Sequence, residues 1–173
     1  VDVRSVEARL RHLPDTNWPA AQDFAVLDRK AMYRVAVDEA MRGLSEGGVP
    51  IGSALVVGES LIASGSNKRV QESSPILHAE IDCLRKAGRP NPAWSGARIL
   101  FTTLSPCLMC AGAAINYAVD EVVIGENVNF EQSEQVLRDF GVKVTVLNDK
   151  PTHEMFGDWT ANHAELWSED IGR

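Results

Sequence analysis

The stretch TTLSPCLMC at residues 102–110 joins an apolar strand to a helix that carries two cysteines. Residues 98–103 are apolar enough for a buried strand. The Ser-Pro pair at 105–106 is typical of a helix start, because serine caps a helix and proline suits its first turn. Cys107 and Cys110 are three residues apart and share one face of the expected helix. Both lie near its first turn, where the helix dipole favours the metal-binding thiolate. The stretch therefore predicts two ligands of one metal ion.

A second motif, His78-Ala79-Glu80, follows a similar Ser-Ser-Pro signal at residues 73–75, from which we expect a helix over residues 75–86. One imidazole and two thiolates make three ligands, which is typical of a catalytic zinc site that leaves a fourth position to water. Glu80 is the carboxylate that can exchange protons with this water. Residues two apart point in different directions on a helix, so the motif works only if His78 lies at the irregular start of its helix.

On sequence alone, blander interpretations of these residues stay open. His78 can be a core histidine, the cysteines can be small buried residues, and Glu80 can be a first-turn acid favoured by the helix dipole. Cys83 is the rival fourth ligand, although it lies roughly 140° round the helix from His78 and is expected in the core. The two motifs together favour a catalytic zinc site over these interpretations, since H-x-E followed by P-C-x-x-C is the signature of zinc nucleobase deaminases.

Composition and charge limit the class of protein. The 173 residues are 45% hydrophobic and 24% charged, which predicts one globular domain. The net charge of −7 disfavours a nucleic-acid partner. Three cysteines do not fit a disulfide framework and favour reduced thiols in the cytoplasm. No apolar run reaches the roughly 20 residues of a membrane span, and the charged start lacks the apolar core of a signal peptide. We therefore expect a cytoplasmic protein with no membrane partner.

Helices and strands alternate along the chain. An apolar stripe from Met32 to Leu44 predicts a helix that starts near Phe24 and stops at Gly47-Gly48 and Pro50. Alternating elements predict an α/β sheet covered on both faces, preceded by an arm over residues 1–23. The expected strands cover residues 51–57, 61–66, 98–103, 121–125 and 142–147, and the further helices cover 105–117, 131–140 and most of the tail from residue 151.

From about residue 24 to the C-terminus, the sequence resembles the cytidine deaminase-like superfamily, and within it the fungal-type cytosine deaminases that act on the free base. The resemblance implies a three-layer α/β/α sandwich around a mixed sheet of about five strands, so that residues 24–173 form one zinc-dependent deaminase domain. It also implies hydrolysis of cytosine to uracil and ammonia, pyrimidine salvage and a homodimer. Besides the metal motifs it rests on EGGVPIG at 46–52, Asn67, TTLSPC at 102–107, GENVNF at 125–130 and WSEDIG at 167–172.

The resemblance also implies a role for each site residue. The zinc ligands match His78, Cys107 and Cys110, and the proton shuttle matches Glu80. The groups that hydrogen-bond the pyrimidine ring match the Asn67 side chain, the Ala79 N–H, the Ser105 carbonyl and the Asp170 carboxylate. The apolar walls around the ring match Ile51, Phe130 and Trp167.

Several points leave the substrate open. Asn67 can be a strand-end cap, Phe130 and Trp167 core aromatics, and Asp170 a surface acid. Ala79 stands where glycine is usual, residues 159–166 depart from the family pattern, and residues 1–23 have no counterpart. The alternatives are another free base such as guanine, a nucleoside such as cytidine, a tRNA adenosine, or a non-catalytic zinc module for protein interactions. The small-residue run at 111–114 permits close helix packing, either in a homodimer or internally.

Overall fold

The computed structural model describes residues 28–172, so the predicted arm at residues 1–23 lies outside the described part of the chain. The helices and strands follow one another in the predicted alternation. They are α2 (Arg29–Ser45), β1 (Gly52–Val57), β2 (Ser60–Ser66), α3 (Ala79–Ala87), β3 (Arg98–Leu104), α4 (Leu108–Asn116), β4 (Glu121–Glu126), α5 (Glu134–Asp139), β5 (Lys143–Val146), α6 (Lys150–Asn162) and α7 (Ala164–Asp170).

The strands form one mixed sheet in the order β2-β1-β3-β4-β5. β1 runs antiparallel to both β2 and β3, whereas β3, β4 and β5 are parallel. The short β1–β2 connection turns at Gly58, whose φ of 59° is one that glycine adopts readily. The predicted α/β fold with a mixed sheet of five strands is confirmed.

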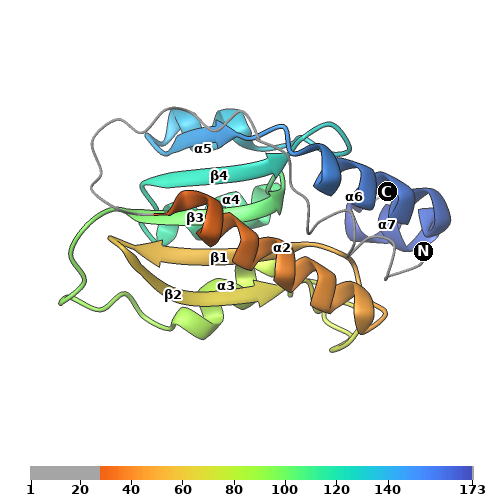
Figure 1. Cartoon of the computed structure of the whole chain (residues 1–173), viewed down its shortest axis with the longest axis horizontal. Coiled ribbons are helices and arrows are strands. Elements are labelled where there is room, and N and C mark those ends of the chain that lie inside the picture. The colour runs from red at the N-terminus through yellow and green to blue at the C-terminus, as the bar shows by residue number, and fades with distance from the viewer. Residues whose placement is uncertain (1–27, 173) are drawn as a thin grey trace.

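Helices cover both faces of the sheet (Figure 1). α2 crosses in front of the strands in this view, and α3 and α4 lie behind them. Because side chains alternate along a strand, Ala54 and Val56 enter the core cluster under α2, while Leu55 enters the cluster under α3 and α4. α2 packs directly on the backbone of β1, since a Cβ atom on Gly52 would lie 2.0 Å from the Ala36 carbonyl oxygen.

The two site helices begin later than their serine-proline signals suggest, so these predicted starts are wrong. α3 begins at Ala79 and α4 at Leu108, and their N-caps are His78 and Cys107. Residues 67–77 instead form turns closed by their own backbone hydrogen bonds, and Ser73 takes a left-handed φ of 47°. A tertiary contact also fixes the Ser105-Pro106 segment outside the helix, because Ser133 Oγ donates to the Pro106 carbonyl at 2.5 Å.

The start of α2 also differs from the prediction, because the helix begins at Arg29, with Asp28 as its N-cap, rather than near Phe24. Its end agrees with the sequence. α2 ends at Ser45, just before Gly47, whose φ of 82° suits the end of a helix. Cys83 is fully buried in the cluster under α3 and α4, as predicted. Between residues 28 and 172, no helix is long and apolar enough to cross a membrane.

Candidate active site

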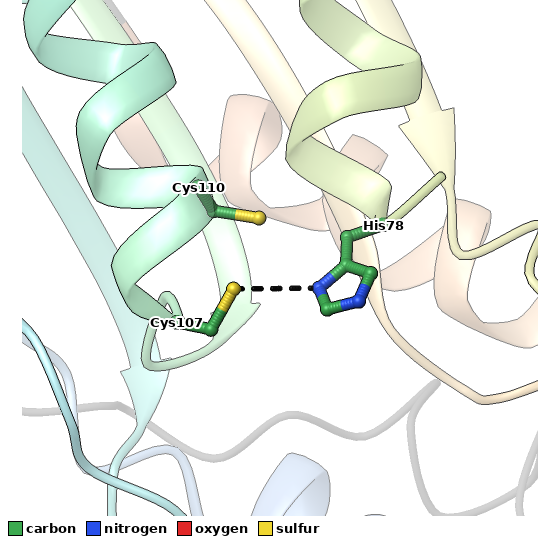
Figure 2. A group of neighbouring side chains, drawn as sticks. All are labelled: His78, Cys107 and Cys110. Atoms are coloured by element: carbon green, nitrogen blue, oxygen red, sulfur yellow. Dashed lines mark hydrogen bonds between the residues drawn. The ribbon is translucent and has the colours of Figure 1, made fainter. Parts of the chain in front are cut away.

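The N-termini of α3 and α4 bring the three predicted metal ligands together. His78 is extended, with φ −70° and ψ 166°, so it lies at the irregular helix start that the motif requires. Cys107 occupies the same N-cap position on α4, and Cys110 lies in the first turn of that helix. Figure 2 shows the imidazole of His78 facing Cys107, with Nδ1 3.5 Å from Sγ. One ligand atom from each of the three residues lies within 4.8 Å of the others.

One nitrogen and two sulfur donors at this spacing fit a zinc ion. In the described part of the chain, no other group of three or more His, Cys, Asp or Glu residues is arranged to hold a metal. Cys83 lies outside the group, since its Sγ contacts the Ala63 carbonyl at 3.4 Å. Three protein ligands leave a coordination position for water, as in catalytic rather than structural zinc sites.

The two thiols have different proton affinities. A hydrogen bond from Cys110, together with the neighbouring His78, lowers the pKa of Cys107 to about 4 despite its partial burial. The interaction with Cys107, with burial, raises the pKa of Cys110. Burial by itself lowers the pKa of His78, but contacts with Cys107, Glu80 and Asp170 outweigh it and raise the pKa. The group therefore holds at least one thiolate at neutral pH, which is the ligand form that zinc needs.

Glu80 lies in the first turn of α3 and is 4% exposed. Its Oε1 atom is 3.3 Å from the hydroxyl oxygen of Thr102 on β3. Burial raises the pKa of the carboxyl, against the opposing effect of His78. A carboxyl whose pKa is raised by burial holds a proton more readily than an exposed one, which suits a group that exchanges protons with a water molecule.

A cavity of about 330 Å³, part of it open to solvent, lies next to the three ligands. Two further lining residues, Leu104 and Ile171, lie within the quoted stretches 102–107 and 167–172 but were given no role of their own. The predicted residues that line the cavity are Ile51, His78, Glu80, Ser105, Cys107, Phe130, Trp167 and Asp170.

Asn67 and Ala79 are not among the lining residues of the cavity. Both are close to the lining residue Ile51, since the Asn67 N–H donates to the Ile51 carbonyl at 2.9 Å and Ala79 belongs to the same core cluster as Ile51. Asn67 follows β2 and is fully buried, with Oδ1 accepting a hydrogen bond from the Arg69 N–H at 3.0 Å. Its Nδ2 atom is buried with no partner within the described residues. A buried donor without a partner is costly, so this amide is available to an acceptor on a ligand. Ala79 is fully buried at the first position of α3.

Aromatic side chains form one wall of the cavity. Trp167 of α7 meets Phe130 edge-to-face at 5.6 Å and Phe156 of α6 at 5.0 Å between ring centroids. The turn that carries Phe130 is shaped by Glu126, whose Oε2 accepts from the N–H groups of Val128 and Asn129 at 2.7 and 3.1 Å. The wall thus joins the loop after β4 to the two C-terminal helices.

Arg69 is a site residue that sequence reasoning missed. Its Nη1 atom lies 2.5 Å from Oδ1 of Asp170, and its Nη2 atom lies 3.3 Å from Oε1 of Glu169. The same Asp170 oxygen is 3.7 Å from Nε2 of His78. A single arginine in a turn, at no fixed spacing from the metal motifs, gives no signal in one sequence.

Residues 27–126 match the family model described as the cytidine and deoxycytidylate deaminase zinc-binding region. The chain belongs to this family. The matched range contains Glu80 and all three residues of the metal group, so the predicted family and its zinc cofactor are confirmed. It ends before Phe130, Trp167 and Asp170, which therefore rest on the geometry of the cavity.

Relatives place the deaminase more closely. It is 42% identical over 147 residues to cytosine deaminase of Candida albicans, covering 84% of this chain and 97% of that one. It is 38% identical over 93 residues to a tRNA-specific adenosine deaminase of Buchnera aphidicola, covering 53% of this chain and 62% of that one. The structure of guanine deaminase from Nitrosomonas europaea superposes with a TM-score of 0.69 over 79% of this chain and 86% of that one, at 22% identity, and thus shares the fold.

Proposed function

We propose that this deaminase hydrolyses free cytosine to uracil and ammonia, with His78, Cys107 and Cys110 as zinc ligands and Glu80 as the proton shuttle. The observation that carries the proposal is that a buried acid, Glu80, and a second carboxylate, Asp170, line the same small cavity beside the three-donor group. The 42% identity to a cytosine deaminase over most of both chains supports the choice of base.

Two donors suit the ring carbonyl at C2. The unpartnered Nδ2 of Asn67 is one, and the backbone N–H of Ala79 at the N-terminus of α3 is the other. The Asp170 carboxylate accepts the ring N1–H, which a free base has and a nucleoside lacks. The Ser105 carbonyl accepts from the exocyclic amine.

Apolar contacts complete the recognition of the ring. Ile51 comes from the chain just before β1, and Phe130 and Trp167 from the aromatic wall, so three separate segments surround one flat ring. Apolar side chains on several sides of the cavity suit a flat heteroaromatic ring.

Zinc, when bound, lowers the pKa of a water toward about 7 and so supplies an activated nucleophile. Glu80 takes a proton from the attacking water and delivers it to ring N3 as the water oxygen bonds to C4. Glu80 then carries the second proton of the water to the exocyclic nitrogen. The C4–N bond breaks, ammonia leaves, and the ring is left as uracil, so atoms and protons balance.

The remaining properties in solution belong to the same proposal. A homodimer is supported by α4, where Gly112 and Ala113 are only half-buried and a Cβ atom on Gly112 would meet nothing within 4 Å. The net charge of −7 supports a small-molecule substrate over tRNA. The proposed substrate supports a role in pyrimidine salvage, and the three free cysteines support a cytoplasmic location.

The proposal is tested by assaying ammonia release from a panel of cytosine, guanine, adenine and cytidine, with the ring product identified by mass. We expect cytosine to give the highest kcat/KM. A higher kcat/KM for guanine or adenine would assign the site to a purine base and contradict the proposal.

A further inference from the structure

The ion pair between Arg69 and Asp170 is the most enclosed charge pair that involves the cavity. The side chains are 7% and 3% exposed, and Nη1 lies 2.5 Å from Oδ1. A buried pair at this distance fixes geometry, because separating it leaves two poorly solvated charges. By contrast, Glu169, the second partner of Arg69, is 70% exposed and is joined at 3.3 Å. Its contribution to stability is therefore small.

The helix that carries Asp170 has few other fixed contacts. None of the seven residues of α7 is fully buried. Its apolar contacts with the rest of the protein are made by Leu166 and Trp167, which pack against the cluster around Phe156 and Trp159. These contacts fix the start and middle of the helix. At its end, Arg69 Nη1 donates a hydrogen bond to Asp170 Oδ1 at 2.5 Å, and His78 Nε2 lies 3.7 Å from the same oxygen.

Arg69 is itself held by the turn that carries Asn67. Its N–H donates to Asn67 Oδ1 at 3.0 Å, and its carbonyl accepts from the Ser74 N–H at 3.1 Å. One turn thus carries the orphaned amide of Asn67 and the cation that meets Asp170. The relative position of two proposed ring contacts depends on this turn.

We propose that Arg69 is the positioning residue for Asp170: it holds Oδ1 beside His78 and leaves Oδ2 to accept the ring N1–H of the substrate. Within residues 28–172, every hydrogen bond and ion pair to the Asp170 side chain goes to Oδ1. The inference rests on the proposed function, since it assigns to Arg69 the geometry of the contact that selects a free base. Arg69 does not touch the ring and acts through the carboxylate.

The test uses 1-methylcytosine, in which a methyl group replaces the N1–H donor of cytosine. The discrimination ratio is kcat/KM for cytosine divided by kcat/KM for 1-methylcytosine. In the zinc-loaded wild type we expect a ratio of at least about tenfold, as for a site built around a substrate N–H. Arg69→Gln should lower this ratio by about tenfold through a higher KM for cytosine, and Arg69→Lys should restore part of it. The control Glu169→Gln should change it by less than about twofold.

A double-mutant cycle separates positioning from a merely structural tie. In the Asp170→Asn background, Arg69→Gln should change the discrimination ratio by less than about twofold, because the carboxylate that it positions is gone. A readout without turnover uses calorimetry on the Glu80→Gln variant. There Arg69→Gln should weaken binding of uracil but leave binding of 1-methyluracil unchanged.

The outcomes distinguish the two levels of the account. A wild type with no cytosine activity contradicts the proposed function, and the inference with it. A wild type that deaminates cytosine but accepts 1-methylcytosine equally well removes the N1–H contact, and hence the inference alone. If Arg69→Gln and Arg69→Lys lower kcat/KM for cytosine and for 1-methylcytosine by the same factor, Arg69 only anchors α7 and the inference is overturned.

Discussion

The Nδ1 atom of His78 lies 3.5 Å from the Sγ atom of Cys107, although the residues are 29 positions apart and start different helices. Neither side chain caps its own helix, so both remain free to face the gap between α3 and α4. Cys110 closes the group from the first turn of α4. This arrangement joins two helix starts through ligands rather than through caps.

The first prediction concerns the metal. The purified protein should hold about one zinc per chain, and Cys107→Ala or Cys110→Ala should lose it, because two remaining ligands bind zinc weakly. Metal analysis by mass spectrometry measures the content. Activity that persists unchanged after exhaustive chelation would contradict the three-ligand site.

Cys83→Ala is the matched control for the two ligand variants. Cys83 is buried in the cluster under α3 and α4, where its Sγ contacts a backbone carbonyl. We expect full zinc content and a loss of about 1 kcal/mol in the free energy of unfolding, as for the removal of one small buried group. Loss of zinc in a folded Cys83→Ala protein would point to a closed structural site instead.

The second prediction concerns Glu80. Glu80→Gln keeps the shape of the side chain but cannot move protons, so kcat should fall by at least about 10²- to 10⁴-fold while zinc is retained. Steady-state kinetics and metal analysis on the same preparation measure both. A variant that loses its zinc would make Glu80 a ligand rather than a shuttle.

The third prediction tests how α2 packs on the sheet. A Cβ atom on Gly52 would lie 2.0 Å from the Ala36 carbonyl oxygen and 2.5 Å from the Ala40 nitrogen, both of which are backbone atoms. Gly52→Ala should therefore lower the free energy of unfolding by about 1 to 3 kcal/mol or more.

Gly157→Ala is the comparison, since the atom nearest to the added methyl would be a side-chain atom, Asn129 Oδ1, at the ordinary contact distance of 3.4 Å. It lies in α6, where alanine favours the helix by up to about 1 kcal/mol. Urea unfolding of both variants measures the difference. Equal destabilisation by the two substitutions would rule out the close approach of α2 to β1.

Much of the fold and the metal group could be predicted because their signals are local. The alternation of strands and helices, the Cys107–Cys110 spacing and the solitary Cys83 all follow from residues close in sequence. The helix starts could not be predicted in this way. Ser73-Ser74-Pro75 has the composition of a helix start, but this segment forms turns with backbone hydrogen bonds to Lys68 and Arg69. The helix α3 begins only after these turns, at Ala79.

The site contacts that the sequence did not predict are those between distant segments. Arg69 meets Asp170 across 101 positions, and Leu104 and Ile171 line the same cavity from distant parts of the chain. Neither contact leaves a periodic or spaced pattern in one chain. Only the resemblance to the deaminase family predicts roles for Asn67 and Asp170, because a lone amide and a lone carboxylate show no characteristic spacing.

The most direct test of the account is the ratio of kcat/KM for cytosine to that for cytidine, measured on the zinc-loaded enzyme and on Asp170→Ala. A buried carboxylate that loses its N–H donor costs more than the roughly 1 to 3 kcal/mol of a neutral group, so the wild type should prefer cytosine by at least about tenfold to hundredfold. Asp170→Ala should lose most of this preference and keep its zinc. A wild type that turns over cytidine at least as well as cytosine would contradict the assignment of a free base as substrate.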